Sequence, residues 1–164
     1  MFKFISFYLL WLFAFFLLID LPFFINTLNL ESIHTQSTIK FSSYLIDFIG
    51  LKVDRVDGID IYIGNHILKV VFGCNGLEAI ILYFCAILAF PNRERVQKYN
   101  WFFWGYLFLF TVNIVRITFL AFVITEYSEY FELMHTYVTQ GIMIFIAFAL
   151  FIYYLKNLNP KRDN

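Results

Sequence analysis

The sequence predicts an all-α integral membrane protein with about four transmembrane helices. We expect a small outer cap that consists of a surface amphipathic helix and a β-hairpin. Of the 164 residues, 61% are hydrophobic and 23% aromatic, whereas 15% are charged. A soluble domain carries about 25% charged residues, so this chain exposes too much apolar surface for water. Its net charge of zero, from 12 basic and 12 acidic residues, gives no electrostatic reason to expect nucleic acid as a partner.

Four apolar segments are long enough to cross a bilayer, which takes about 20 residues of helix. The first segment is interpreted as an uncleaved anchor, because its apolar core is long and no small-residue cleavage site follows it. The predicted single membrane domain, 1–164, comprises the spans 4–24, 71–90, 99–124 and 137–155, the outer cap segment 26–70, the cytoplasmic loop 91–98, the outer loop 126–136 and the cytoplasmic tail 156–164.

The orientation is predicted from lysine and arginine in the short segments between spans. Segment 91–98 carries two arginines and a lysine, and segment 156–164 carries two lysines and an arginine. Segment 126–136 carries three glutamates and neither lysine nor arginine. We therefore expect a multi-pass protein of the cytoplasmic (inner) membrane, with both termini in the cytoplasm.

The outer cap segment has two local patterns. Phe41, Tyr44, Leu45 and Phe48 are spaced i, i+3, i+4 and i+7, which predicts an amphipathic helix that ends at Gly50. Because this helix joins two spans, we expect it to lie along the membrane surface.

The second pattern is "IDIYIGNHILKV" (59–70), in which apolar and polar residues alternate around Gly64-Asn65. Such a two-residue turn predicts a β-hairpin, and its register pairs Asp60 with Lys69. The hairpin leads directly into the second span.

Polar residues at membrane depth are candidates for function, because they are costly there. Cys74, Arg116 and His135 stand 17, 18 and 21 residues from the predicted cytoplasmic ends of their helices. These are rises of about 25 to 32 Å, close to the ~30 Å thickness of the hydrocarbon core. Three side chains from three spans are therefore predicted to reach one level near the outer interface.

These three residue types suit acyl transfer. A thiolate from Cys74 is a nucleophile, which a nearby cation or imidazole activates. His135 can take the thiol proton and return it to a leaving amine, and Arg116 can stabilise an oxyanion. Glu78 follows Cys74 by four positions and Asn113 precedes Arg116 by three, so each of these pairs shares a helix face. We found no spacing typical of metal ligands and predict no cofactor.

At these residues the sequence resembles the exosortase/archaeosortase family of multi-pass membrane proteins. The resemblance covers about residues 40 to 155 and rests on "GCNGLE" (73–78), "NIVR" (113–116) and "FELMHTYVTQG" (131–141), in that order. Asn75 stands where many members have serine, and Glu78 where many have a basic residue. With only one span before the core, the chain is similar to short members of the exosortase F type.

The resemblance implies a cysteine protease or transpeptidase whose site lies at the outer face of the membrane. Its substrates would be exported proteins with a C-terminal sorting signal of three parts: a short motif, a transmembrane helix and a basic tail. The acyl group would pass to an acceptor nucleophile that the sequence does not identify. Membrane lipid would surround the enzyme. Cys74, Arg116 and His135 would be catalytic. The supporting residues would be Asn75, Gly76, Glu78 and Asn113, of which Glu78 and Asn113 would orient Arg116.

Other interpretations remain open at this point. The chain could be a non-catalytic membrane assembly or transport subunit, in which Glu78 and Arg116 form a structural or ion-path pair. It could also be a family member that binds sorting helices without cleaving them. His135 could be an interfacial side chain without a catalytic role, and His34 and His66 were expected to be solvated or structural.

Overall fold

The structure is a computed structural model that describes residues 2–20, 30–71, 73–90 and 95–157. It contains helices α1 (Phe2–Asp20), α3 (Leu30–Phe48), α4 (Leu77–Ala89), α5 (Arg95–Glu126), α6 (Phe131–Leu133) and α7 (Gln140–Lys156), a 3₁₀ helix at Ser128–Tyr130 and a π-helix at Met134–Thr139. The strands are β1 (Arg55–Asp57), β2 (Asp60–Ile63) and β3 (His66–Lys69). The predicted end of the first span after Asp20, part of the 91–98 loop and most of the basic tail lie outside the described residues.

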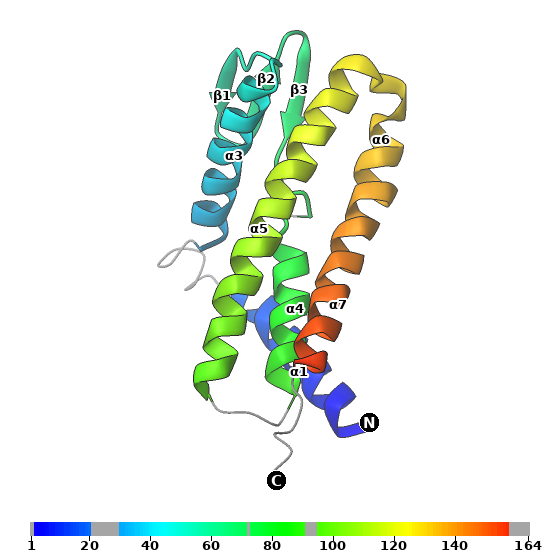
Figure 1. The fold of residues 1–164 in the computed structure, drawn as a ribbon. Coiled ribbons are helices and arrows are strands. Elements are labelled where there is room, and N and C mark those ends of the chain that lie inside the picture. Colours follow the sequence, from blue (N-terminus) through cyan, green and yellow to red (C-terminus); the bar gives the residue numbers. More distant parts are fainter. Residues whose placement is uncertain (1, 21–29, 72, 91–94, 158–164) are drawn as a thin grey trace.

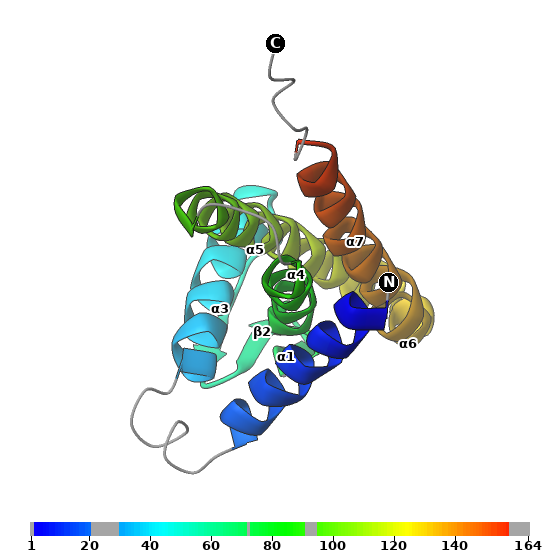
Figure 2. The same cartoon turned by 90° about the horizontal axis from the view of Figure 1, so that it is seen from below.

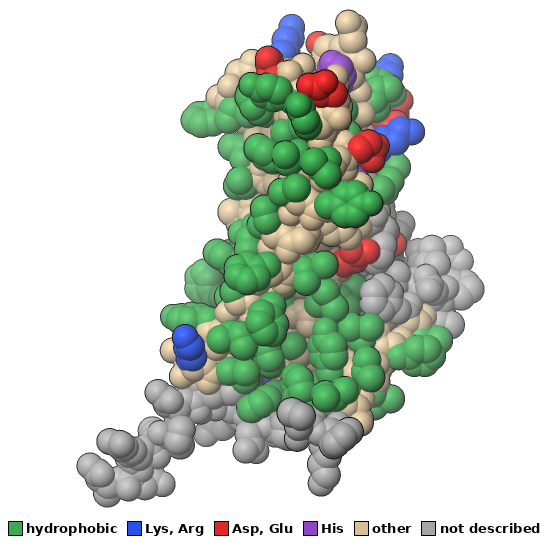
Figure 3. Space-filling model, turned by 90° about the vertical axis from the view of Figure 1, so that its right-hand side faces the viewer, with side chains coloured by type: hydrophobic (Ala, Val, Ile, Leu, Met, Phe, Trp, Pro, Cys, Tyr) green, Lys and Arg blue, Asp and Glu red, His purple; other side chains and the backbone are tan. Residues whose placement is uncertain are grey.

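The helices and the sheet form two packed regions along α5 (Figures 1 and 2). In one region α1, α4, the first half of α5 and α7 pack around Tyr83, Ile87, Leu109 and Met143. In the other region, α3 and the sheet pack against the second half of α5. Figure 3 shows apolar side chains over much of one side of the molecule, with acidic and basic ones gathered toward the sheet end.

Among the described residues, two helices are long and apolar enough to cross a membrane, 98–126 and 128–156, each of 29 residues. The other two predicted spans correspond to shorter helices, α1 with 19 residues and α4 with 13. At 1.5 Å per residue α4 is about 20 Å long, less than the ~30 Å of the hydrocarbon core. The predicted span 71–90 is helical only from Leu77, because Gly73 and Gly76 adopt positive φ angles of 90° and 79° that interrupt a helix.

The cap contains the predicted hairpin and one further strand. Strands β2 and β3 pair antiparallel with Asp60 opposite Lys69, which confirms the predicted register. β1 adds to the free edge of β2 and gives the strand order β1-β2-β3. The guanidinium of Arg55 lies 4.3 Å from the centre of the Tyr62 ring, so a cation–π contact supports this added edge.

Helix α3 has a different orientation from the one predicted. It stands alongside α5 and does not lie across the end of the bundle (Figure 1). The predicted stripe faces away from the protein, since Phe41, Tyr44 and Phe48 are exposed. The opposite face of α3, which carries mostly small and polar side chains, packs on α5 and the sheet.

The connection between the last two long helices is shorter than predicted. Helix α5 ends at Glu126 and helical turns resume at Ser128, so most of the predicted loop 126–136 is helical. The helix that follows changes from α to π between Met134 and Thr139 and then returns to α. His135 therefore lies within a helix, in a π-helical segment of a kind that is frequent at functional sites.

Candidate active site

Cys74 lies in a short turn, residues 73–76, that links β3 to α4. The backbone N–H groups of Cys74 and Asn75 both donate to the carbonyl of Val71, at 2.9 and 3.0 Å. Oδ1 of Asn75 accepts from the N–H of Leu77 at 3.0 Å and so satisfies a free donor at the start of α4. Asn75 thus fixes the turn to the helix that follows it.

Gly76 is the closest contact between this turn and α5. A Cβ atom at this position would lie 2.6 Å from Cγ of Asn113, well inside van der Waals contact. The Asn113 side chain is fully buried, and neither of its amide atoms has a hydrogen-bond partner among the described residues. Only glycine therefore allows the Cys74 turn to approach α5 this closely.

Arg116 connects the three parts of the chain that carry the candidate catalytic residues. Its Nη1 donates to the carbonyl of Gly73 at 3.3 Å, directly before Cys74. Its Nε donates to Oγ1 of Thr139 at 2.9 Å, and that hydroxyl donates to the carbonyl of His135 at 3.3 Å. Arg116 is buried, and its Nη2 has no partner among the described residues. The Arg116 guanidinium thus links the Cys74 turn to the π-helix by hydrogen bonds and still has N–H donors on Nη2 that no described residue accepts, so they are free to bind another group.

His135 lies one helical turn from Thr139 in the π-helix. Its ring stacks on Phe131, with centroids 5.5 Å apart and ring planes 15° apart. The ring is partly exposed, and within the described part of the chain it makes no hydrogen bond. Its two ring nitrogens therefore have no hydrogen-bond partner in the described part of the chain.

The thiol of Cys74 is covered. Cys74 is 1% exposed and belongs to an apolar cluster that also includes Val70, Ile117 and Leu120. Phe131 and Met134, on either side of the α6–π-helix junction, pack against this cluster. Both cysteines of the chain are free thiols, as the sequence predicts for Cys74.

Glu78 and Asn113 do not contact Arg116 in the way the sequence suggested. Oε2 of Glu78 accepts from Nε2 of Gln140 at 3.1 Å, which joins α4 to α7. Glu78 and Arg116 do not form an ion pair within 4.0 Å, and Asn113 makes no hydrogen bond to Arg116. The guanidinium is held by Thr139 and by the backbone of Gly73 instead.

Among the residues at this site that sequence reasoning missed is His34. It is buried, and its Nε2 donates to the carbonyl of Asn75 at 3.0 Å. Because a carbonyl can only accept, Nε2 carries the proton and Nδ1 accepts from the Tyr106 hydroxyl at 3.1 Å. Nδ2 of Asn75 also donates to Oγ1 of Thr35 at 3.0 Å. The signal that could have identified His34 is the run of polar residues at helical spacing that it begins, in a helix between two apolar spans.

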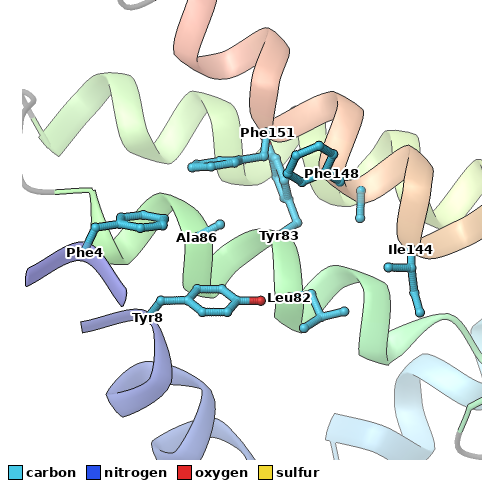
Figure 4. A pocket seen from close by; sticks show the side chains of 9 residues that line it. Phe4, Tyr8, Leu82, Tyr83, Ala86, Ile144, Phe148 and Phe151 are labelled. Carbon is cyan, nitrogen blue, oxygen red and sulfur yellow. The ribbon is translucent and has the colours of Figure 1, made fainter. Parts of the chain in front are cut away.

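A cavity of about 260 Å³ lies apart from Cys74, between α1, α4 and α7 (Figure 4). Its lining is almost entirely apolar and includes Tyr8, Tyr83, Leu82, Ile144 and Phe148. Among the described residues, no group of three or more His, Cys, Asp or Glu side chains could hold a metal ion.

Comparison with known proteins places this geometry in a family. A family model described as transmembrane exosortase matches residues 1–154. The chain belongs to the transmembrane exosortase family. This match confirms the resemblance found in the sequence motifs and identifies the chain as a membrane protein. Exosortases are generally transpeptidases or proteases. No curated protein and no solved structure matches this exosortase.

Proposed function

We propose that this exosortase is a membrane-embedded cysteine protease or transpeptidase. It would cleave C-terminal sorting signals of exported proteins and transfer the acyl group to an acceptor nucleophile. The supporting observation is the position of Arg116, which donates to the carbonyl next to Cys74 and to Thr139, one turn from His135. A cation beside a thiol favours the thiolate, and its remaining donors can bind an oxyanion.

The proposed reaction uses three residues in order. The sulfur of Cys74 attacks the carbonyl carbon of the scissile peptide bond, and His135 takes the thiol proton. Arg116 donates hydrogen bonds to the oxyanion of the tetrahedral intermediate. The C–N bond then breaks, His135 returns the proton to the leaving amine, and a thioester remains on Cys74. An acceptor nucleophile attacks this thioester, releases the product and restores the thiol.

The burial of Cys74 requires that a substrate displaces a cover before it can react. Phe131 and Met134 are two of the four partly buried apolar side chains that pack against the Cys74 cluster, and they lie on the helix that also carries His135. Substrate binding would move this segment and so bring His135 and the scissile bond to the thiol together.

The proposed substrates carry a short motif, a transmembrane helix and a basic tail, as the family resemblance implies. We place the enzyme in the inner membrane with both termini in the cytoplasm and the site toward the outer face, following the distribution of lysine and arginine. The alternative of a non-catalytic assembly or transport subunit based on a Glu78–Arg116 pair has less support, because these groups do not form a direct ion pair in the described chain.

The test is the reaction of the purified protein in detergent with methyl methanethiosulfonate, a small thiol reagent, followed by mass spectrometry. We expect Cys74 to react faster than Cys85, which is a buried thiol on α4, a helix without lysine or arginine. Arg116→Gln should slow Cys74 about tenfold or more while leaving Cys85 unchanged. Equal rates for the two thiols in wild-type protein, unaffected by Arg116→Gln, would contradict an activated nucleophile.

A further inference from the structure

The two faces of α3 have the opposite polarity to that of a helix on a water-soluble core. Its buried face carries Thr35, Thr38 and Ser42 together with His34, Ile39 and Ile46. Its outward face carries four large apolar side chains, which we call the α3 stripe: Ile33, Phe41, Tyr44 and Phe48, which are 60%, 52%, 63% and 85% exposed. Small and hydroxyl residues toward the protein, with large apolar residues outward, are typical of helices packed within a bilayer.

The height of α3 along α5 places this stripe at membrane depth. The part of α5 that is long and apolar enough to cross a membrane begins at Lys98. The ring of His34 meets that of Tyr106 at 5.8 Å, and Phe41 meets Phe110 at 5.9 Å. Tyr106 and Phe110 are eight and twelve residues after Lys98, so these contacts lie about 12 and 18 Å along the helix. Both heights are within the ~30 Å of hydrocarbon that a spanning helix crosses.

The stripe is also continuous with the apolar exterior of α5. Helix α3 packs alongside α5 (Figure 1), and the exposed side chains of α5 over the same stretch include Leu107, Phe108, Val115 and Phe119. Since α5 spans the membrane, lipid surrounds its exposed face. The α3 stripe lies beside this face at the same height along α5, so lipid would surround the stripe as well.

We propose that α3 is embedded in the bilayer beside α5, with the α3 stripe in contact with lipid acyl chains. Lys40 is exposed beside the stripe, and its long side chain would reach toward the headgroups, as basic side chains near a membrane do. The turn at residues 73–76 then lies below the level of the headgroups, because it packs on Asn113, about 22 Å above Lys98. The proposal depends on family membership and packing and not on catalysis by Cys74.

The experiment measures the collision of nitroxide labels with oxygen, which partitions into hydrocarbon, and with a water-soluble nickel complex. Single cysteines replace Phe41 and Tyr44 in a Cys74→Ser, Cys85→Ala background, in dioleoylphosphatidylcholine vesicles. Phe108→Cys on α5 is the matched lipid control. Ile67→Cys on β3 is the control for water, because Ile67 is 45% exposed on the sheet.

We expect labels at Phe41 and Tyr44 to give the same ratio of oxygen to nickel collision rates as the label at Phe108. This ratio should be several-fold higher than the ratio at Ile67. Nickel collisions equal to those at Ile67 would overturn the proposal, because the stripe would then face water. Low collision rates with both reagents would also overturn it, since another protein surface would then cover the stripe.

A second measurement uses the wild-type chain and does not depend on the folding of variants. Vesicles that contain a phospholipid with a diazirine in its acyl chain are irradiated, and the modified peptides are mapped by mass spectrometry. We expect adducts in residues 30–48 as well as in α5. Adducts in α5 without any in residues 30–48 would overturn the proposal.

Discussion

His34 donates a hydrogen bond from Nε2 to the backbone carbonyl of Asn75 at 3.0 Å, across 41 positions of sequence. The same ring accepts from the hydroxyl of Tyr106 on α5. The imidazole thus holds α3, α5 and the Cys74 turn at a fixed separation through neutral hydrogen bonds. We assign it as a positioning residue, because it acts on Cys74 through the backbone of the adjacent residue.

Replacing His34 with leucine should therefore destabilise the Cys74 turn. The variant leaves the buried carbonyl of Asn75 without its donor, which costs about 1–3 kcal/mol. We expect a lower unfolding temperature in detergent and a changed rate of Cys74 labelling. His34→Gln, which retains a side-chain N–H donor, should recover part of both. His66→Ala on β3 is the control, and equal behaviour of the His34→Leu and His66→Ala variants would argue against the positioning role.

Thr139→Val should show how much the orientation of the Arg116 guanidinium matters, because the variant leaves the charge of Arg116 unchanged. Valine keeps the shape of threonine but removes the hydroxyl that accepts from Nε of Arg116 at 2.9 Å. A hydrogen bond to a charged group contributes about 1.5–3 kcal/mol, so we expect the Cys74 labelling rate to fall about tenfold. Thr111→Val is the matched control, because the Thr111 hydroxyl donates to its own helix at Leu107 on an exposed face. An unchanged rate in Thr139→Val would show that this bond does not orient the guanidinium.

Gly76→Ala and Gly141→Ala should change stability in opposite directions. A Cβ at residue 76 would require a left-handed φ of 79° and would meet Asn113 at 2.6 Å. Together these effects should cost about 2–4 kcal/mol. At residue 141 in α7 a Cβ meets nothing within 4 Å, and alanine favours a helix over glycine by about 1 kcal/mol. Thermal melting followed by circular dichroism in detergent measures both. A tolerated Gly76→Ala would contradict the close approach of the turn to α5.

Phe131→Ala should expose the thiol. The Phe131 ring packs against the cluster that contains Cys74 and stacks on His135, so its removal opens a path from the surface. We expect methyl methanethiosulfonate to label Cys74 several-fold faster than in wild type. Tyr130→Ala, which truncates a neighbouring side chain that is 50% exposed, should leave the rate unchanged. If both variants label at the wild-type rate, access to Cys74 follows a different path.

The sequence was sufficient for features that local geometry determines. The Asp60–Lys69 register follows from a two-residue turn, because the turn length leaves one pairing of the strands. The proximity of Arg116 to the Cys74 turn and to Thr139 agrees with positions counted from helix rise alone. Counting gives height along a helix but not rotation about it, so it could not predict which side chains Arg116 contacts. Cys74 itself precedes the helical part of its predicted span.

Other features depended on information that a single sequence does not hold. The spacing of Phe41, Tyr44 and Phe48 identifies the apolar side of α3, but it does not tell whether that side meets protein or lipid. The prediction of a helix along the membrane surface did not include its packing alongside α5. His34, expected to be solvated or structural, is structural. Predicting that α4 starts at Leu77 would have required the φ angles of Gly73 and Gly76. The apolar sequence around these glycines does not indicate them.

The π-helical segment at Met134–Thr139 is equivalent to one extra residue inserted into an α-helix. It shifts the angular phase of every later side chain by about 100° relative to the preceding turns. The helix can therefore present Phe131 to the Cys74 cluster before the segment and Gln140 to Glu78 after it. Deleting one residue between 134 and 139 would return the segment to a regular α-helix and keep those two contacts in alignment, whereas the full sequence wound as an unbroken α-helix would put them out of alignment. The π-helical segment thus allows one continuous helix to fit two differently placed neighbours.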